Sequence, residues 1–88
     1  MIFISLVKFR QKLTKENMAE QEKRTKEAAK EGVKFLGTYS TLGRYDAVYI
    51  CEAPDVKTAM KYSMKAADVA ATETLVAVSA EEARKLVE

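Results

Sequence analysis

Two short apolar segments separated by a glycine limit the folds open to this chain more than any other feature. Residues 33–42 and 45–53 are rich in aromatic and β-branched side chains, which is typical of strands. Gly43 lies between them, where a tight connection requires a residue that tolerates a positive φ angle. The sequence therefore predicts an antiparallel hairpin. Gly37 predicts a bulge or a close helix approach within its first strand.

Capping residues divide the rest of the chain into helices and strands. Thr14, Asp55 and Ser79 each carry a side-chain oxygen that can accept from an unpaired backbone N–H in a first helical turn. Gly32 is the left-handed residue expected after a helix. Besides the hairpin, the predicted elements are a strand over 2–9, a helix over 14–31, a helix over 56–67, a strand over 72–79 and a short last helix.

Helical periodicity predicts which face of each helix packs inward. The expected inward residues of the first helix are Thr14, Met18, Gln21, Thr25, Ala28 and Gly32, and those of the second are Val56, Ala59, Met60, Ser63, Met64 and Ala67. The last helix is expected to pack through Ala83, Leu86 and Val87. On the outer face of the first helix, ion pairs four residues apart are expected: Glu20 with Arg24, Glu22 with Lys26, and Lys23 with Glu27.

The order of elements predicts one α+β domain over residues 1–88 with a ferredoxin-like βαββαβ arrangement and a short C-terminal helix. In that fold the helices cover one face of a four-stranded antiparallel sheet. The strands here are apolar on both faces, and an uncovered apolar sheet would be an aggregation liability. We therefore expect a homodimer packed sheet to sheet, with a larger ring as a further possibility.

Composition excludes several classes of function. Fifteen basic and 13 acidic residues give a net charge of only +2, with both signs interspersed, so neither nucleic acid nor a membrane surface is an expected partner. Histidine is absent, which excludes histidine-based nucleophile systems and a typical zinc site within this chain. We expect no metal and no cofactor. The single cysteine, Cys51, indicates a reducing compartment, and the short apolar N-terminus resembles neither a signal peptide nor a membrane helix, so a cytoplasmic location is expected.

Three segments together resemble a known family. These are Gly43-Arg44-Tyr45-Asp46 at the hairpin, Glu52-Ala53-Pro54-Asp55 after it, and Thr72-Glu73-Thr74-Leu75 in the last strand. Together they are similar to the GYD domain family of small stand-alone proteins, with Arg44 standing between the glycine and the tyrosine of the family pattern. The resemblance spans essentially the whole chain. It implies a dimeric α/β-barrel and assigns no activity and no catalytic residues. The chain is more distantly similar to the effector-binding domains of leucine-responsive-type regulators, which implies a ligand-binding module without a DNA-binding domain.

Three charged residues are candidates for a site. Asp46 at the start of a buried strand could act as a general base or hold a ligand amine, although capping of local backbone is the commoner role of an aspartate at a turn. Arg44 could bind a carboxylate or phosphate, or remain in solvent, or bridge to a partner subunit. Glu73 could join Asp46 as a second carboxylate for acid–base chemistry or for a hard cation, although two carboxylates far apart in the sequence are a weak signal.

The remaining candidates are less polar. Tyr39, Tyr45 and Tyr49 could line a pocket, but burial of their rings in a dimer interface is the preferred interpretation. Cys51 is interpreted as a small buried side chain, because nothing nearby in the sequence stabilises a thiolate.

Three functions follow from these candidates. The preferred one is the binding of a small polar metabolite in a cleft near the Gly43 hairpin, lined by Tyr39, Arg44, Tyr45 and Asp46. The alternatives are a dimeric α/β-barrel enzyme that uses Asp46 or Glu73 as acid or base, and an assembly module without a ligand.

Overall fold

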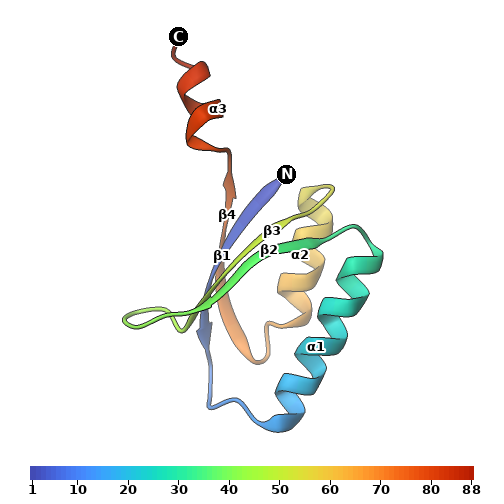
Figure 1. Cartoon of the computed structure of the whole chain (residues 1–88). Helices are drawn as coiled ribbons and strands as arrows, with labels where there is room; N and C mark the ends of the chain where they lie inside the picture. The colour runs from blue at the N-terminus through green and yellow to red at the C-terminus, as the bar shows by residue number, and fades with distance from the viewer.

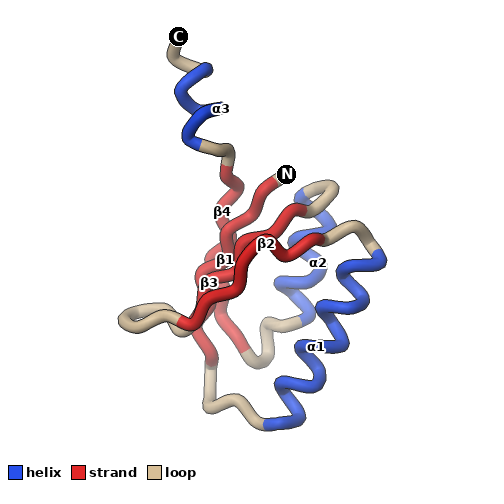
Figure 2. Tube along the Cα trace, viewed as in Figure 1, coloured by secondary structure: helices blue, strands red, loops and turns tan.

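Four strands form one open antiparallel sheet in the order β2-β3-β1-β4 (Figures 1 and 2). The strands of this computed structural model, which describes residues 1–88, are β1 (Ile2–Phe9), β2 (Lys34–Ser40), β3 (Ala47–Glu52) and β4 (Ala70–Ala77). β1 lies centrally and pairs with both β3 and β4. The predicted ferredoxin-like fold is confirmed. Because the sheet of one chain is open, the expected barrel would require a second chain.

Two helices cover one face of the sheet, and a third lies away from it. α1 (Lys15–Lys30) and α2 (Val56–Lys65) lie side by side on that face, whereas α3 (Ala80–Lys85) projects beyond the end of β4 (Figure 1). All three predicted N-caps, Thr14, Asp55 and Ser79, accept a hydrogen bond from the backbone three residues later. None of these helices has the length and apolar character needed to cross a membrane.

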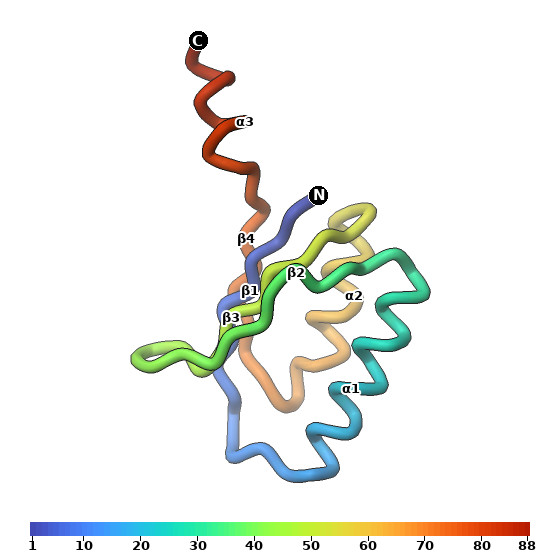
Figure 3. The backbone as a smooth tube through the Cα atoms, viewed as in Figure 1, coloured from blue at the N-terminus to red at the C-terminus, as the bar shows by residue number.

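Glycine supplies the two positive φ angles of the backbone. Gly32 ends α1 with φ +89°, and Gly43 lies in the β2–β3 connection with φ +99°, as predicted. That connection is a six-residue loop, residues 41–46, which extends beyond the sheet (Figure 3). It is longer than the expected tight turn. The register between β2 and β3 shifts from Phe35 to Gly37, which confirms the bulge.

The space between the helices and the sheet is only partly filled. Seven residues are buried, and they form two separate small clusters. One contains Phe3, Ala28, Val33 and Ala53, and the other contains Val7, Ala47 and Ala70. Six of these seven side chains are alanine or valine, which are too small to fill the space beneath two helices. A hollow is therefore left within the layer.

The expected inward face of α1 is partly wrong. Met18 is 52 % exposed, and Arg24 is half-buried toward the sheet instead of pairing with Glu20. Among the three expected outer pairs only Glu22 with Lys26 forms. The observed inward stripe has the predicted spacing but is rotated around the helix axis by about one residue. Its buried or half-buried positions are Asn17, Gln21, Arg24 and Ala28. Periodicity alone favoured the apolar Met18 over its polar neighbours.

The inward faces of α2 and α3 also differ from expectation. Val56, Met60 and Met64 are exposed, because Ala59, Tyr62, Ser63 and Ala66 take the positions facing the sheet. In α3 and its C-terminal end, Leu86 and Val87 are 79 % and 85 % exposed, so the predicted packing of the last helix is absent. The direction of the chain after β4 carries this helix away from the domain (Figure 1).

The second face of the sheet, here called the outer face, carries no helix. The register places Ile4, Ile50 and Leu75 side by side on it, and Leu6 beside Val48. Tyr39 is opposite Val48 on the same face. The expectation of an apolar and uncovered sheet face is confirmed.

Candidate functional site

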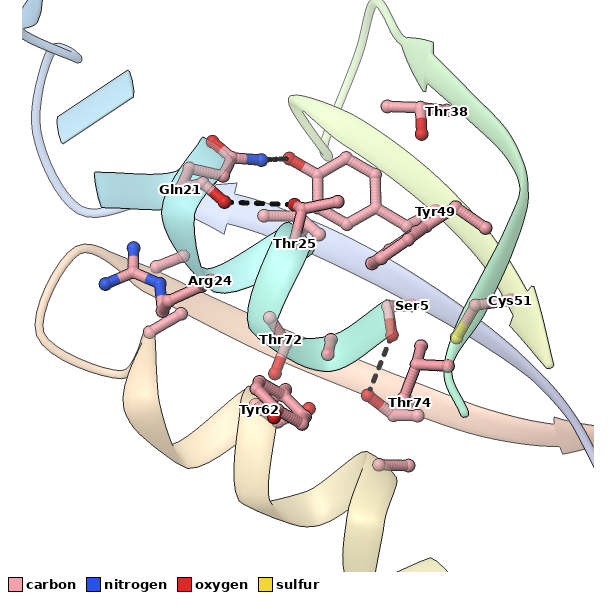
Figure 4. Close-up of a pocket in the computed structure, with 18 of the residues that line it drawn as sticks. Ser5, Gln21, Arg24, Thr25, Thr38, Tyr49, Cys51, Tyr62, Thr72 and Thr74 are labelled. Atoms are coloured by element: carbon pink, nitrogen blue, oxygen red, sulfur yellow. Dashed lines mark hydrogen bonds between the residues drawn. The ribbon is translucent and has the colours of Figure 1, made fainter. Parts of the chain in front are cut away.

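A cleft of about 300 Å³ lies between α1, α2 and the inner face of the sheet. Figure 4 shows that strands and helices both contribute to its wall. Most lining residues are hydrophobic, among them Phe3, Val7, Phe9, Leu13, Val33 and Phe35. This inner cleft exists because the small side chains that face each other across the layer leave the space between them unfilled.

Two hydrogen-bonded pairs bring polar atoms into this apolar surface. Ser5 Oγ and Thr74 Oγ1 are 3.1 Å apart on neighbouring strands, β1 and β4. Gln21 Nε2 on α1 donates to the hydroxyl of Tyr49 on β3 at 2.7 Å (Figure 4). Each pair joins elements that are far apart in the sequence, so the fold itself fixes the positions of these polar groups.

Tyr49 is placed differently from its expected position in a dimer interface. The register puts it on the same face as Ser5, which is the face beneath α1. Its ring packs edge-on against Phe35, with centroids 6.5 Å apart. The hydroxyl therefore points toward α1 and lines the inner cleft. Tyr62 also lines this cleft, whereas Tyr39 and Tyr45 do not.

Cys51 lies at the end of the inner cleft opposite Arg24 in the view of Figure 4. Burial raises the pKa of its thiol above the usual 9.0, because the apolar surroundings disfavour the thiolate. It is the only cysteine, and it remains a neutral, weakly nucleophilic group. Its interpretation as a small unreactive side chain fits this environment, although Cys51 is half-buried and not fully buried.

Ion pairs join the C-terminal half of α1 to α2 beside the inner cleft. Glu31 accepts from Lys61 Nζ at 2.7 Å and from the Tyr62 hydroxyl, and Glu27 lies 3.6 Å from Lys65. The Lys61 and Tyr62 hydrogen bonds lower the pKa of Glu31 below its usual 4.5. The same hydrogen bond to Glu31 raises the pKa of Tyr62 to about 12. These contacts connect the two helices along one side of the cleft.

The side chain of Asp46 is hydrogen-bonded to the backbone at the end of β1. Its Oδ2 accepts from the Phe9 amide at 2.8 Å, and its own amide donates to the Val7 carbonyl at 2.8 Å. Lys8 lies 3.8 Å from Oδ1. These contacts match the capping role considered for this residue, and Asp46 does not line the inner cleft.

The other predicted site residues lie around the loop and the outer face. The Tyr45 hydroxyl donates to Glu73, which raises the pKa of Tyr45 above its usual 10.0. Arg44 lies over the Tyr45 ring, 5.6 Å from its centroid. Tyr39 is 59 % exposed. The structure thus brings Arg44, Tyr45 and Glu73 together and places none of these four residues in the inner cleft.

Most of the polar residues that line the inner cleft were not among the site residues predicted from the sequence. Ser5 interrupts an apolar strand, and Gln21 and Arg24 are polar residues three apart on one helix face. Thr72 and Thr74 alternate along β4 on the face that carries Ser5. Polar residues recurring at the inward positions of three elements were the available signal of a polar-lined hollow.

Comparison with known proteins agrees with the fold. A family model described as "GYD domain" matches residues 3–87, which is nearly the full length. No curated protein matches this chain.

Proposed function

The chain belongs to the GYD domain family, and from that premise we propose that it is a binding protein that holds a small molecule in the inner cleft. The observation that carries the proposal is the cleft itself, a hollow of about 300 Å³ with an apolar wall and a few fixed polar groups. Small-molecule sites in proteins usually have this character. Such a site suits a ligand with an apolar body and a polar end.

The geometry supports binding over acid–base catalysis. Asp46 holds the Phe9 amide, and Glu73 accepts from Tyr45 on the other side of the sheet, so neither candidate carboxylate faces the cleft. The ligand is therefore proposed to contact the strands of the hairpin through Thr38 and Tyr49, and not the loop at Gly43. Tyr39 on β2 and the loop residues Arg44 and Tyr45 are better placed for contacts with another copy.

Amide chemical shifts test the binding proposal. A ¹⁵N-labelled sample titrated with benzamide, a small neutral aromatic probe, should show shifts at residues lining the inner cleft. Ala59→Leu extends a side chain into the cleft from α2 and should abolish these shifts. Ala29→Leu, on the exposed face of α1, is the matched control and should retain them. Shifts that are absent, or that survive in Ala59→Leu while its circular dichroism is unchanged, would refute the proposal.

We further propose that two copies pack through their outer faces to form the dimeric barrel. The support is the row of apolar residues Ile4, Ile50 and Leu75, which no helix covers. Val48→Lys places a charge on the same face, beside Leu6, and should shift the sedimentation coefficient to that of a monomer. Lys23→Glu, on exposed α1, should leave it unchanged. A native protein that sediments as a monomer at 50 μM would contradict the proposal.

The lone Cys51 supports a reducing compartment such as the cytoplasm.

A further inference from the structure

Arg24 is the one charged residue that lines the inner cleft. Figure 4 shows its side chain leaving α1 near Gln21, in the region between the two helices. It forms no hydrogen bond, ion pair or aromatic contact within the chain. By contrast, Arg10 donates to the Ala67 carbonyl at 2.7 Å, and Arg44 lies over Tyr45. The guanidinium of Arg24 therefore keeps all its donors available.

No acidic residue of α1 pairs with Arg24: Glu20, four residues before it, forms no ion pair, and the acidic residues that follow it have other partners. Glu27 is paired with Lys65, and Glu31 with Lys61 and Tyr62. No aspartate or glutamate lines the inner cleft. An unpaired positive charge beside an apolar wall is only weakly screened, so it attracts an anion and repels a cation more strongly than it would in water.

We propose that the ligand of the inner cleft is a small organic acid, with its carboxylate on Arg24 and its apolar body along the sheet. This inference rests on the binding function proposed above. The planar guanidinium matches a carboxylate with two parallel hydrogen bonds. With one cation and otherwise neutral groups, the site matches the charge of a single carboxylate and not that of a phosphate dianion.

Tyr49 is placed to bind a second polar atom of the acid. Its hydroxyl oxygen accepts from Gln21, and its own hydrogen has no acceptor within the chain. An oxygen on the ligand, such as a ring hydroxyl or carbonyl, can take that hydrogen. Ser5 and Thr74, already paired with each other, form a neutral polar patch on the sheet beneath.

Benzoate and benzamide are a matched pair for the test, because they have nearly the same shape and differ in charge. We expect benzoate to bind at least about tenfold more tightly than benzamide, as measured by amide shifts at neutral pH. Arg24→Gln should remove this preference by weakening benzoate about tenfold, while the affinity for benzamide changes less than about twofold. Lys23→Gln makes the same charge change on the adjacent, exposed residue and should preserve the preference.

The two proposals fail in different ways. If benzamide shifts the residues lining the inner cleft but benzoate binds no more tightly, or if Arg24→Gln retains the preference, the organic-acid inference is overturned and the binding function stands. If neither probe shifts these residues, both proposals are overturned. If Lys23→Gln loses the preference as fully as Arg24→Gln does, the preference comes from net charge and not from Arg24.

Discussion

Replacing Asp46 with alanine removes the acceptor of one backbone hydrogen bond that joins the β2–β3 loop to the end of β1. The Phe9 amide, 2.8 Å from Oδ2, would then have only water to donate to, at a partly buried position. Asp46→Asn keeps an oxygen acceptor of the same length and removes only the charge. Comparing these two variants therefore separates the hydrogen bond from the electrostatics.

The expected loss follows from the kind of bond. A hydrogen bond from an amide to a charged group contributes about 1.5–3 kcal/mol to the free energy of unfolding. The Asp46 side chain is 37 % exposed, which favours the lower part of that range, about 2 kcal/mol for alanine. For a domain of this size, that corresponds to a melting temperature roughly 8–16 °C lower. Asp46→Asn should lose about half as much, because a neutral acceptor makes a weaker bond.

The ion pair between Lys8 and Asp46 is the competing explanation. At 3.8 Å, and with the Lys8 side chain 57 % exposed, this pair is expected to contribute less than about 0.5 kcal/mol. Lys8→Gln should accordingly leave the free energy of unfolding almost unchanged. Urea unfolding followed by far-UV circular dichroism measures all three variants. Protein concentration must be held constant, since association contributes to apparent stability.

The reasoning would be refuted by either of two results. If Asp46→Ala unfolds at the native urea concentration, the Phe9 amide does not depend on this acceptor. If Lys8→Gln loses as much as Asp46→Ala, the charge pair and not the backbone hydrogen bond is the source of stability.

Three further predictions concern the two glycines with positive φ angles and the contact between the helices. Gly32→Ala should lower the free energy of unfolding in urea more than Gly43→Ala does. Both substitutions cost about 1–2 kcal/mol because alanine is strained in a left-handed backbone conformation. Only at Gly32 would the new Cβ also meet a side-chain atom, at 3.1 Å. Equal losses would contradict this. Glu31→Gln should be less stable than the native protein above about pH 5, and the two should converge as pH falls through the lowered pKa of Glu31, because the ionised carboxylate is the form its partners stabilise. A difference that persists at pH 2 would contradict this. In an ultraviolet titration of the four tyrosines, Tyr62→Phe should remove the step near pKa 12, and Glu31→Gln should return that step toward 10.

Sequence patterns were reliable where a local chemical requirement determined the structure. Thr14, Asp55 and Ser79 cap helices because their own side chains satisfy the first-turn amides, and Gly43 adopts a positive φ because few other residues do so without strain. These requirements involve only a few neighbouring residues. The order of elements, and through it the fold, followed from them.

The inner cleft depends instead on distances between layers, which no local pattern contains. Arg24 and Met18 lie on adjacent stripes of α1, and only the separation of helix and sheet decides which one turns inward. An arginine could occupy the inward stripe because the facing positions are small and leave room for it. Asp46 shows the converse case, since the partner of its carboxylate is an amide 37 residues away.

The projecting helix α3 makes the C-terminus responsive to its surroundings. Six residues are too few for a helix to persist alone in water, and every residue from 78 to 88 is exposed. The fraction of α3 that is helical must therefore depend on whether the segment contacts another surface. Ordering the segment on contact has an entropic cost, which lowers the affinity of that contact and keeps it reversible. The rate of hydrogen exchange at the α3 amides therefore reports association. Exchange should be fast in the isolated chain and should slow in proportion to the fraction of time that the segment is docked.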